Sequence, residues 1–301
     1  MKPAIIGLAG PSLTAAEAAL LRDEQPLGVI IFRRNVRDPA QLRGLCDAVR
    51  EALGRPAPIL VDQEGGRVAR LGPPHWPEFP PAASFEDGPA AAARANAEAL
   101  GRVCVEAGPD VVCAPCLDLR LPDGHGVIGD RAFSADPAEV ARLGAAWIEG
   151  LRAAGVTPVI KHIPGHGRAT LDSHAALPVV EASRAELALD FAPFRALAAR
   201  DLWAMTAHVL YTALDPARCA TVSPLVVQEV IRGEIGFTGF LVSDDLDMGA
   251  LGGPLAERAT ASLAAGCDAV LQCSGVLEHA AAVLAACPFA TEAALSRMTH
   301  A

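Results

Sequence analysis

The sequence predicts an α/β protein, a single (β/α)8 barrel that occupies residues 1–301 as one domain. Eight short β-rich runs recur along the chain, helical patterns separate them, and most of the runs are continuously apolar. Strands have this pattern when both faces of a parallel sheet are covered. The length of 301 residues suits one such barrel with insertions. The predicted strands are 4–8, 28–32, 58–61, 111–114, 157–160, 202–206, 240–243 and 268–272.

Several of the intervening segments carry helix start signals. Asp38 and Asp136 each precede a proline, and Ser183 stands three residues before Glu186, which is the spacing of a capping box. A doubly wound sheet would usually have a GxGxxG phosphate loop after its first strand, and residues 8–12 lack it. We therefore expect a closed barrel with one longer insertion around 72–89.

The composition excludes several classes of protein. A net charge of -10 opposes binding to a nucleic-acid backbone. No segment reaches the roughly 18 apolar residues of a membrane span, and the first apolar run is too short for a signal peptide. The expectation is a cytoplasmic protein that contacts neither membrane nor nucleic acid. Because no zipper or apolar stripe stands out, we expect a monomer.

The eight cysteines lie mostly inside apolar segments, which is typical of buried thiols in a reducing compartment. We expect no structural disulfide. Cys113 and Cys116 form a CxxC pair, but no second pair stands at the spacing of a zinc site. Packing in the core is the preferred interpretation of both residues.

Polar residues follow four of the predicted strands directly. Asp62 ends the third strand, Lys161 and His162 the fifth, His208 the sixth and Asp244 the seventh. A single carboxylate at such a position is often only the cap of the next helix. In a parallel barrel, however, the carboxyl ends of all strands meet on one rim, where active sites are built. Four such ends together indicate a site.

These residues also carry a resemblance to a known family. The segments VDQEGGRV (61–68), KHIPGHG (161–167), DSH (172–174) and SDDLDM (243–248) resemble the signatures of glycoside hydrolase family 3. The histidine-rich loop resembles the bacterial β-N-acetylglucosaminidase branch of that family, which recycles cell-wall fragments, and differs from the β-glucosidases. The chain departs from the branch at Ile163, where phenylalanine is usual, and over 119–126, which matches poorly.

The resemblance implies a role for each matching residue. Asp244 falls on the nucleophile, and Asp172 and His174 fall on a catalytic dyad. The implied substrate is a short glycan with a terminal non-reducing N-acetylglucosamine, such as N-acetylglucosaminyl-anhydro-N-acetylmuramic acid from peptidoglycan. It implies no metal and no other cofactor. The positions that fall on the sugar-binding residues of the family are Asp62, Arg70, Arg131, Lys161 and His162.

The chemistry of these residue types agrees with the implied roles. Retaining hydrolysis needs a carboxylate that attacks the anomeric carbon and a group that protonates the leaving oxygen and then deprotonates water. Histidine titrates near neutrality without a large pKa shift. Asp172 can accept the second ring N–H of His174 and fix its tautomer, as a triad aspartate does. Asp62 can accept hydrogen bonds from sugar hydroxyls, and the cationic residues can donate to them.

Other readings of the same residues remain open. A family 3 β-glucosidase would share most of these motifs. A neutral histidine base would also let phosphate approach a glycosyl-enzyme, which makes a phosphorylase an alternative. A metal-dependent hydrolase could use His162, His166, His174 and His208 as ligands, although HIPGH lacks the spacing of HxH or HExxH. A non-catalytic sugar-binding barrel would have no need of Asp244.

Overall fold

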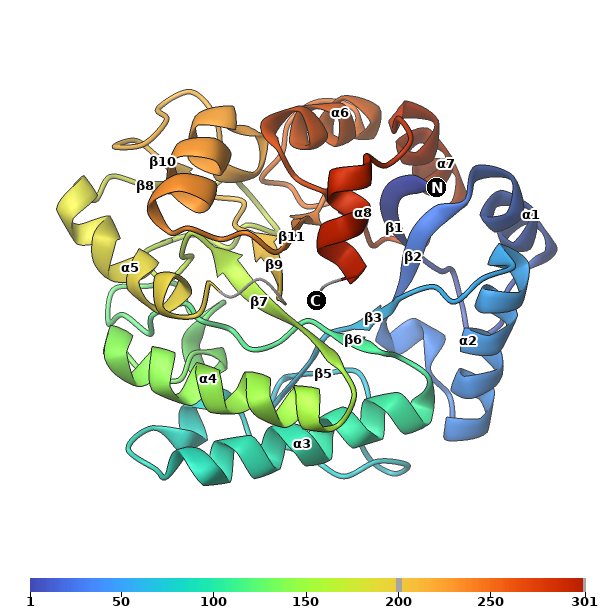
Figure 1. Cartoon of the computed structure of the whole chain (residues 1–301), viewed down its shortest axis with the longest axis horizontal. Helices are drawn as coiled ribbons and strands as arrows, with labels where there is room; N and C mark the ends of the chain where they lie inside the picture. Colours follow the sequence, from blue (N-terminus) through green and yellow to red (C-terminus); the bar gives the residue numbers. More distant parts are fainter. Residues whose placement is uncertain (199–201, 300–301) are drawn as a thin grey trace.

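The computed structural model describes residues 1–198 and 202–299, which form a closed barrel of parallel strands (Figure 1). Neighbours around the barrel follow the order β1-β12-β11-β9-β7-β6-β3-β2, and β1 pairs with both β2 and β12. All eight predicted strands are confirmed. Their bounds are β1 (Lys2–Gly7), β2 (Pro26–Ile31), β3 (Ile59–Val61), β6 (Val111–Val112), β7 (Thr157–Ile163), β9 (Trp203–Thr206), β11 (Phe240–Asp245) and β12 (Ala269–Gln272).

Helices surround the barrel (Figure 1). The predicted start signals are confirmed: Asp38 accepts the backbone N–H of Gln41, and Ser183 and Glu186 form a reciprocal capping box. The helices are α1 (Ala15–Glu24), α2 (Pro39–Leu53), α3 (Ala90–Ala107), α4 (Pro137–Ala153), α5 (Arg184–Ala196), a π-helix (Val226–Glu234), α6 (Leu255–Ala265), α7 (Leu277–Ala286) and α8 (Glu292–Thr299). Because the barrel strands are parallel, every loop from a strand to the next helix begins at the carboxyl end of the barrel.

The apolar core has two layers. One lies between the strands and the surrounding helices. The other fills the inside of the barrel with residues such as Ile5, Trp203 and Phe240, and Ala294 of α8 packs into it. Helix α8 lies across the barrel in Figure 1 and covers its amino end. A functional site is thus confined to the opposite, carboxyl end.

Short additional strands shape that carboxyl end. β4 (Gln63–Gly65) and β5 (Val68–Ala69) form an antiparallel pair directly after β3, and β8 (Val179–Val180) pairs with β10 (Leu210–Tyr211). The insertion at 72–89 contains only the 3-10 turn Ala82–Phe85.

The eight cysteines are buried with free thiols, which confirms the expected core packing of Cys113 and Cys116. Across 1–198 and 202–299, we find no helix with the length and apolar character needed to cross a bilayer.

Candidate active site

A pocket of about 320 Å³ opens at the carboxyl ends of the barrel strands. Side chains from several strand ends and from the loop after β7 converge on it, as the sequence predicted. All eight predicted site residues line it: Asp62, Arg70, Arg131, Lys161, His162, Asp172, His174 and Asp244. The aliphatic and aromatic part of its wall includes Phe32, Val127, Ile128, Met205 and Met248.

One wall of the pocket is a chain of paired charges, buried at its centre and partly buried at its ends. Lys161, only 1% exposed, donates from Nζ to Asp62 Oδ1 at 2.8 Å and lies 2.5 Å from Glu64 Oε1. Arg131 binds Glu64 with two parallel hydrogen bonds, of 2.8 and 2.9 Å. Arg70 closes the other end by donating to Asp62 Oδ2 at 3.0 Å. These donors and acceptors are held in fixed positions before any ligand arrives.

The pairing decides the ionisation of the cluster. Burial alone would raise the pKa of Glu64, but Arg131 and Lys161 outweigh it and lower the pKa to about 2. For Asp62, burial likewise opposes Lys161 and Arg70, and its pKa lies well below the usual range. The pKa of Lys161 is raised because the two carboxylates overcome its own burial. The wall is therefore fully charged at neutral pH.

Replacement of Glu64 by Gln should destabilise the protein by about 3 kcal/mol or more, because it leaves two buried cations with one partner fewer. Urea unfolding followed by circular dichroism measures this difference. The matched control is Glu149→Gln, whose carboxylate is 69% exposed and lies 3.7 Å from Arg94. That variant should change the free energy of unfolding by less than about 1 kcal/mol. Equal losses in the two variants would contradict the importance of the buried cluster.

Asp244 lies at the end of β11, on the floor of the pocket. Its Oδ1 accepts the backbone N–H of Asp245 at 2.8 Å, and its own N–H donates to Thr206 Oγ1 at 3.3 Å. Within the described residues, Oδ2 has no hydrogen-bond partner. Burial raises the pKa of Asp244, but His208, His162 and Lys161 together outweigh burial, and the pKa lies below its usual value. One oxygen of an ionised carboxylate is thus available to a ligand.

The neighbouring carboxyl group behaves differently. Burial, with added repulsion from Asp247 and Asp244, raises the pKa of Asp245 to about 7. Its Oδ1 accepts the backbone N–H groups of Asp247 and Cys273, both at 3.0 Å. The pocket therefore contains two adjacent carboxyl groups whose pKa values are shifted in opposite directions.

Asp172 and His174 lie on the loop between β7 and β8 and also line the pocket. His174 Nδ1 lies 2.8 Å from Asp172 Oδ1, which also accepts the backbone N–H of His174 at 2.9 Å. The His174 side chain is 66% exposed, far more than Asp244. The pair is formed, and it faces the pocket from the solvent side.

The loop that carries this pair is attached to the segment after β11. Gly249 and Ala250 donate backbone hydrogen bonds of 3.1 and 3.2 Å to the carbonyls of His174 and Ser173. A Cβ on Gly249 would lie only 2.8 Å from the Ala175 carbonyl oxygen and 2.9 Å from that of His174, so glycine permits this approach. On the other side, Ser173 Oγ lies 3.1 Å from His166 Nε2.

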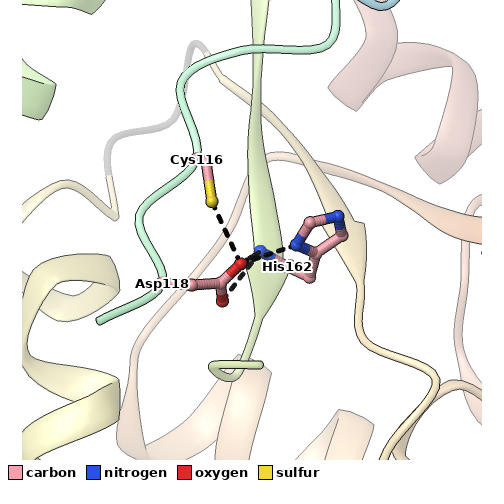
Figure 2. A group of neighbouring side chains, drawn as sticks. All are labelled: Cys116, Asp118 and His162. Carbon is pink, nitrogen blue, oxygen red and sulfur yellow. Dashed lines mark hydrogen bonds and ion pairs between the residues drawn. The ribbon is translucent and has the colours of Figure 1, made fainter. Parts of the chain in front are cut away.

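Figure 2 shows three buried residues beside the pocket, Cys116, Asp118 and His162. Their potential metal-ligand atoms lie within 4.8 Å of one another. Asp118 already accepts hydrogen bonds from the His166 backbone and the Cys116 thiol, at 2.6 and 3.2 Å. Burial raises the pKa of the Cys116 thiol well above its usual value, so the thiol keeps its proton and donates it to Asp118. The three residues form a closed hydrogen-bond cluster.

Three further residues have clear positions. Arg67 forms a salt bridge of 2.8 Å with Asp130 and so braces two loops. Trp147 is buried in the core. Trp76 packs against the core and does not line the pocket.

Several residues of the site had no predicted role in hydrolysis. Glu64 and His166 stood inside the recognised motifs, and Asp245 directly follows Asp244. Asp118 comes shortly after the fourth strand, so the rule of polar residues at strand ends could have indicated it. No sequence signal pointed to the contact between Ser173 and His166, because it depends on how the loop folds back.

The family model described as glycosyl hydrolase family 3 N terminal domain matches residues 5–297. A β-hexosaminidase from Alkalilimnicola ehrlichii is 44% identical over 285 residues, which are 90% of this chain and 80% of that protein. A Pseudomonas aeruginosa β-hexosaminidase is 42% identical over 282 residues, 90% of this chain and 82% of its own length.

Solved structures agree with these relatives. NagZ from Neisseria gonorrhoeae, in complex with N-trifluoroacetyl-D-glucosamine, superposes with a TM-score of 0.91 at 34% identity, over 99% of this chain and 89% of that one. A family 3 β-N-acetylglucosaminidase from Paenibacillus sp. str. FPU-7 gives a TM-score of 0.88 at 35% identity and covers 94% of this chain. The present chain spans 56% of the length of that protein.

Proposed function

The chain belongs to glycoside hydrolase family 3, and from this premise we propose that it is a retaining exo-β-N-acetylglucosaminidase. It resembles enzymes of the β-hexosaminidase type along nearly its whole length. In this proposal residues 1–301 act as one catalytic domain. In the proposed reaction the enzyme releases a terminal non-reducing N-acetylglucosamine from a short glycan. The proposed physiological substrate is N-acetylglucosaminyl-anhydro-N-acetylmuramic acid from peptidoglycan turnover.

The observation that carries the proposal is that Asp244 and the pair formed by Asp172 and His174 line one pocket. Asp244 is partly buried and ionised, and the histidine lies on the solvent side. In the proposed reaction, Asp244 attacks the anomeric carbon while His174 protonates the leaving oxygen. His174 then removes a proton from the water that releases the sugar from Asp244. Asp172 orients the ring and stabilises the imidazolium between these steps.

The charged wall supports the recognition of a single sugar. Pockets for small ligands are typically about 300–1,000 Å³, and the volume of about 320 Å³ lies at the low end of that range. We assign Asp62, Arg70, Arg131, Lys161 and His162 to the sugar hydroxyls. Because Lys161 and Arg131 are already held by carboxylates, they reach the ligand in fixed directions and lose little conformational entropy on binding.

A comparison of two chromogenic substrates tests the proposal. We expect kcat/KM for a 4-nitrophenyl β-N-acetylglucosaminide to exceed that for the matching β-glucoside by roughly 100-fold or more, since a site that hydrogen-bonds a substituent strongly rejects the analogue that lacks it. A preference for the glucoside would move the chain to the β-glucosidases. A parallel reaction with inorganic phosphate should yield free N-acetylglucosamine, and accumulation of the sugar 1-phosphate would indicate a phosphorylase.

A further inference from the structure

Asp118 is a buried carboxylate that no step of the proposed reaction uses. It follows β6, its side chain is fully buried, and it lies behind His162 as seen from the pocket. Its Oδ2 lies 2.6 Å from His162 Nδ1 and 3.2 Å from the Cys116 thiol. Its Oδ1 accepts the backbone N–H of His166 at 2.6 Å, and both oxygens lie 3.3 Å from the backbone nitrogen of His162. Every neighbour of this carboxylate is a donor or can become one.

The two ring nitrogens of His162 therefore have opposite surroundings. Figure 2 shows Nδ1 facing the carboxylate of Asp118 and the other ring nitrogen pointing away from it. Nε2 lies 3.5 Å from Nη2 of Arg131, which can only donate. A proton on Nδ1 satisfies Asp118, whereas a proton on Nε2 would face another donor. Of the two tautomers, the surroundings therefore favour the one with its proton on Nδ1.

We propose that Asp118 is a positioning residue that holds His162 in the Nδ1–H tautomer and so presents Nε2 to the sugar as a hydrogen-bond acceptor. His162 then accepts a hydrogen bond from a sugar hydroxyl, beside Lys161 and Arg131, which only donate. A hydroxyl placed between these side chains can donate to Nε2 while it accepts from a cation. An ether at that point would satisfy only the cation, and a deoxy position would satisfy neither side. The sugar as ligand rests on the proposed function; the tautomer does not.

The backbone contacts of Asp118 determine which way an amide would face in its place, and this permits a test of the tautomer. In Asp118→Asn, the amide oxygen must remain toward the His166 backbone N–H, because that donor is held at 2.6 Å and cannot be reversed. The amide NH2 group then faces His162 Nδ1. Nδ1 must become the acceptor, the proton moves to Nε2, and the ring presents a donor to the sugar. The same exchange of carboxylate for amide reverses the histidine tautomer in the serine protease triad.

Long-range ¹H–¹⁵N correlation spectra of ¹⁵N-histidine-labelled protein measure the tautomer without substrate, and a His162→Gln variant identifies the signals among the eight histidines. We expect an unprotonated Nε2 in the wild type and an unprotonated Nδ1 in Asp118→Asn. For the variant, kcat/KM should fall roughly 10- to 100-fold, the loss that one broken buried hydrogen bond causes. The matched control, Asp190→Asn, removes a buried carboxylate that binds Arg168 at 2.6 Å outside the pocket, and it should leave the tautomer unchanged.

An Nε2–H tautomer or an imidazolium in the wild type would overturn the proposal, even if Asp118→Asn does not fold. A folded Asp118→Asn protein that retains the wild-type tautomer would overturn it as well. Preference for a glucoside over an N-acetylglucosaminide would remove the proposed function and leave the tautomer result intact. The two failures are therefore distinguishable.

Discussion

Substitution of Asp244 by Asn should reduce kcat/KM by roughly 10³-fold or more, because covalent catalysis is lost when the nucleophile is removed. The structure gives this carboxylate a free oxygen in the pocket, and His208, His162 and Lys161 hold its pKa below the usual value. An amide retains the shape and the contact with the Asp245 backbone. It cannot form a glycosyl ester. The expected loss is therefore mainly in kcat, with a small change in KM.

Steady-state kinetics with an N-acetylglucosaminide measures this effect, and Asp47→Asn, the same change at an exposed site on α2, is the control. Mass spectrometry adds a direct readout. An activated 5-fluoro N-acetylglucosaminyl fluoride, which keeps the 2-acetamido group, should leave a covalent adduct on the peptide that contains Asp244 in the wild type, and none in the variant. An adduct on another residue, or a variant with normal turnover, would refute the assignment of the nucleophile.

The barrel could be predicted because its information is local. Eight apolar runs with helix caps between them identify each β-then-α unit, and the parallel arrangement brings Asp62, Lys161 and Asp244 to one rim without further detail. The same rule explains why a residue such as Asp62 could be selected although its partners were unknown. Both the fold and the main site residues can thus be predicted from local patterns, each of which lies within one short segment of the sequence.

The partners of those residues could not be predicted, because they depend on distances between distant segments. Lys161 was assigned to the sugar, yet its Nζ is held by Asp62 and Glu64, which lie about a hundred residues earlier in the chain. Asp118 has no distinguishing motif, and its importance appears only when His162 and the His166 backbone are seen to share it. Buried polar groups must be paired, but the sequence does not specify with which partner.

Removal of the His174 side chain should lower kcat/KM for a substrate with a poor leaving group by roughly 10²- to 10⁴-fold, the usual contribution of a general acid and base. A nitrophenyl aglycone leaves without protonation, so the first step should suffer less with it. The second step still needs a base, and the glycosyl-enzyme should accumulate. We therefore expect the His174→Ala variant to release a burst of nitrophenol and then to turn over slowly. Stopped-flow absorbance measures both phases.

Azide distinguishes this role from a structural one. It attacks the anomeric carbon without losing a proton, so it should restore turnover of His174→Ala and yield the β-glycosyl azide, while leaving Asp244→Asn inactive. The exposed position of His174 leaves room for such an anion on the solvent side of the pocket. A loss that azide cannot rescue, with equal effects on both kinds of leaving group, would mean that the loop only shapes the pocket. Retained anomeric configuration in the azide product means that azide enters on the face of the anomeric carbon opposite Asp244, which is the face on which His174 acts in the proposed reaction.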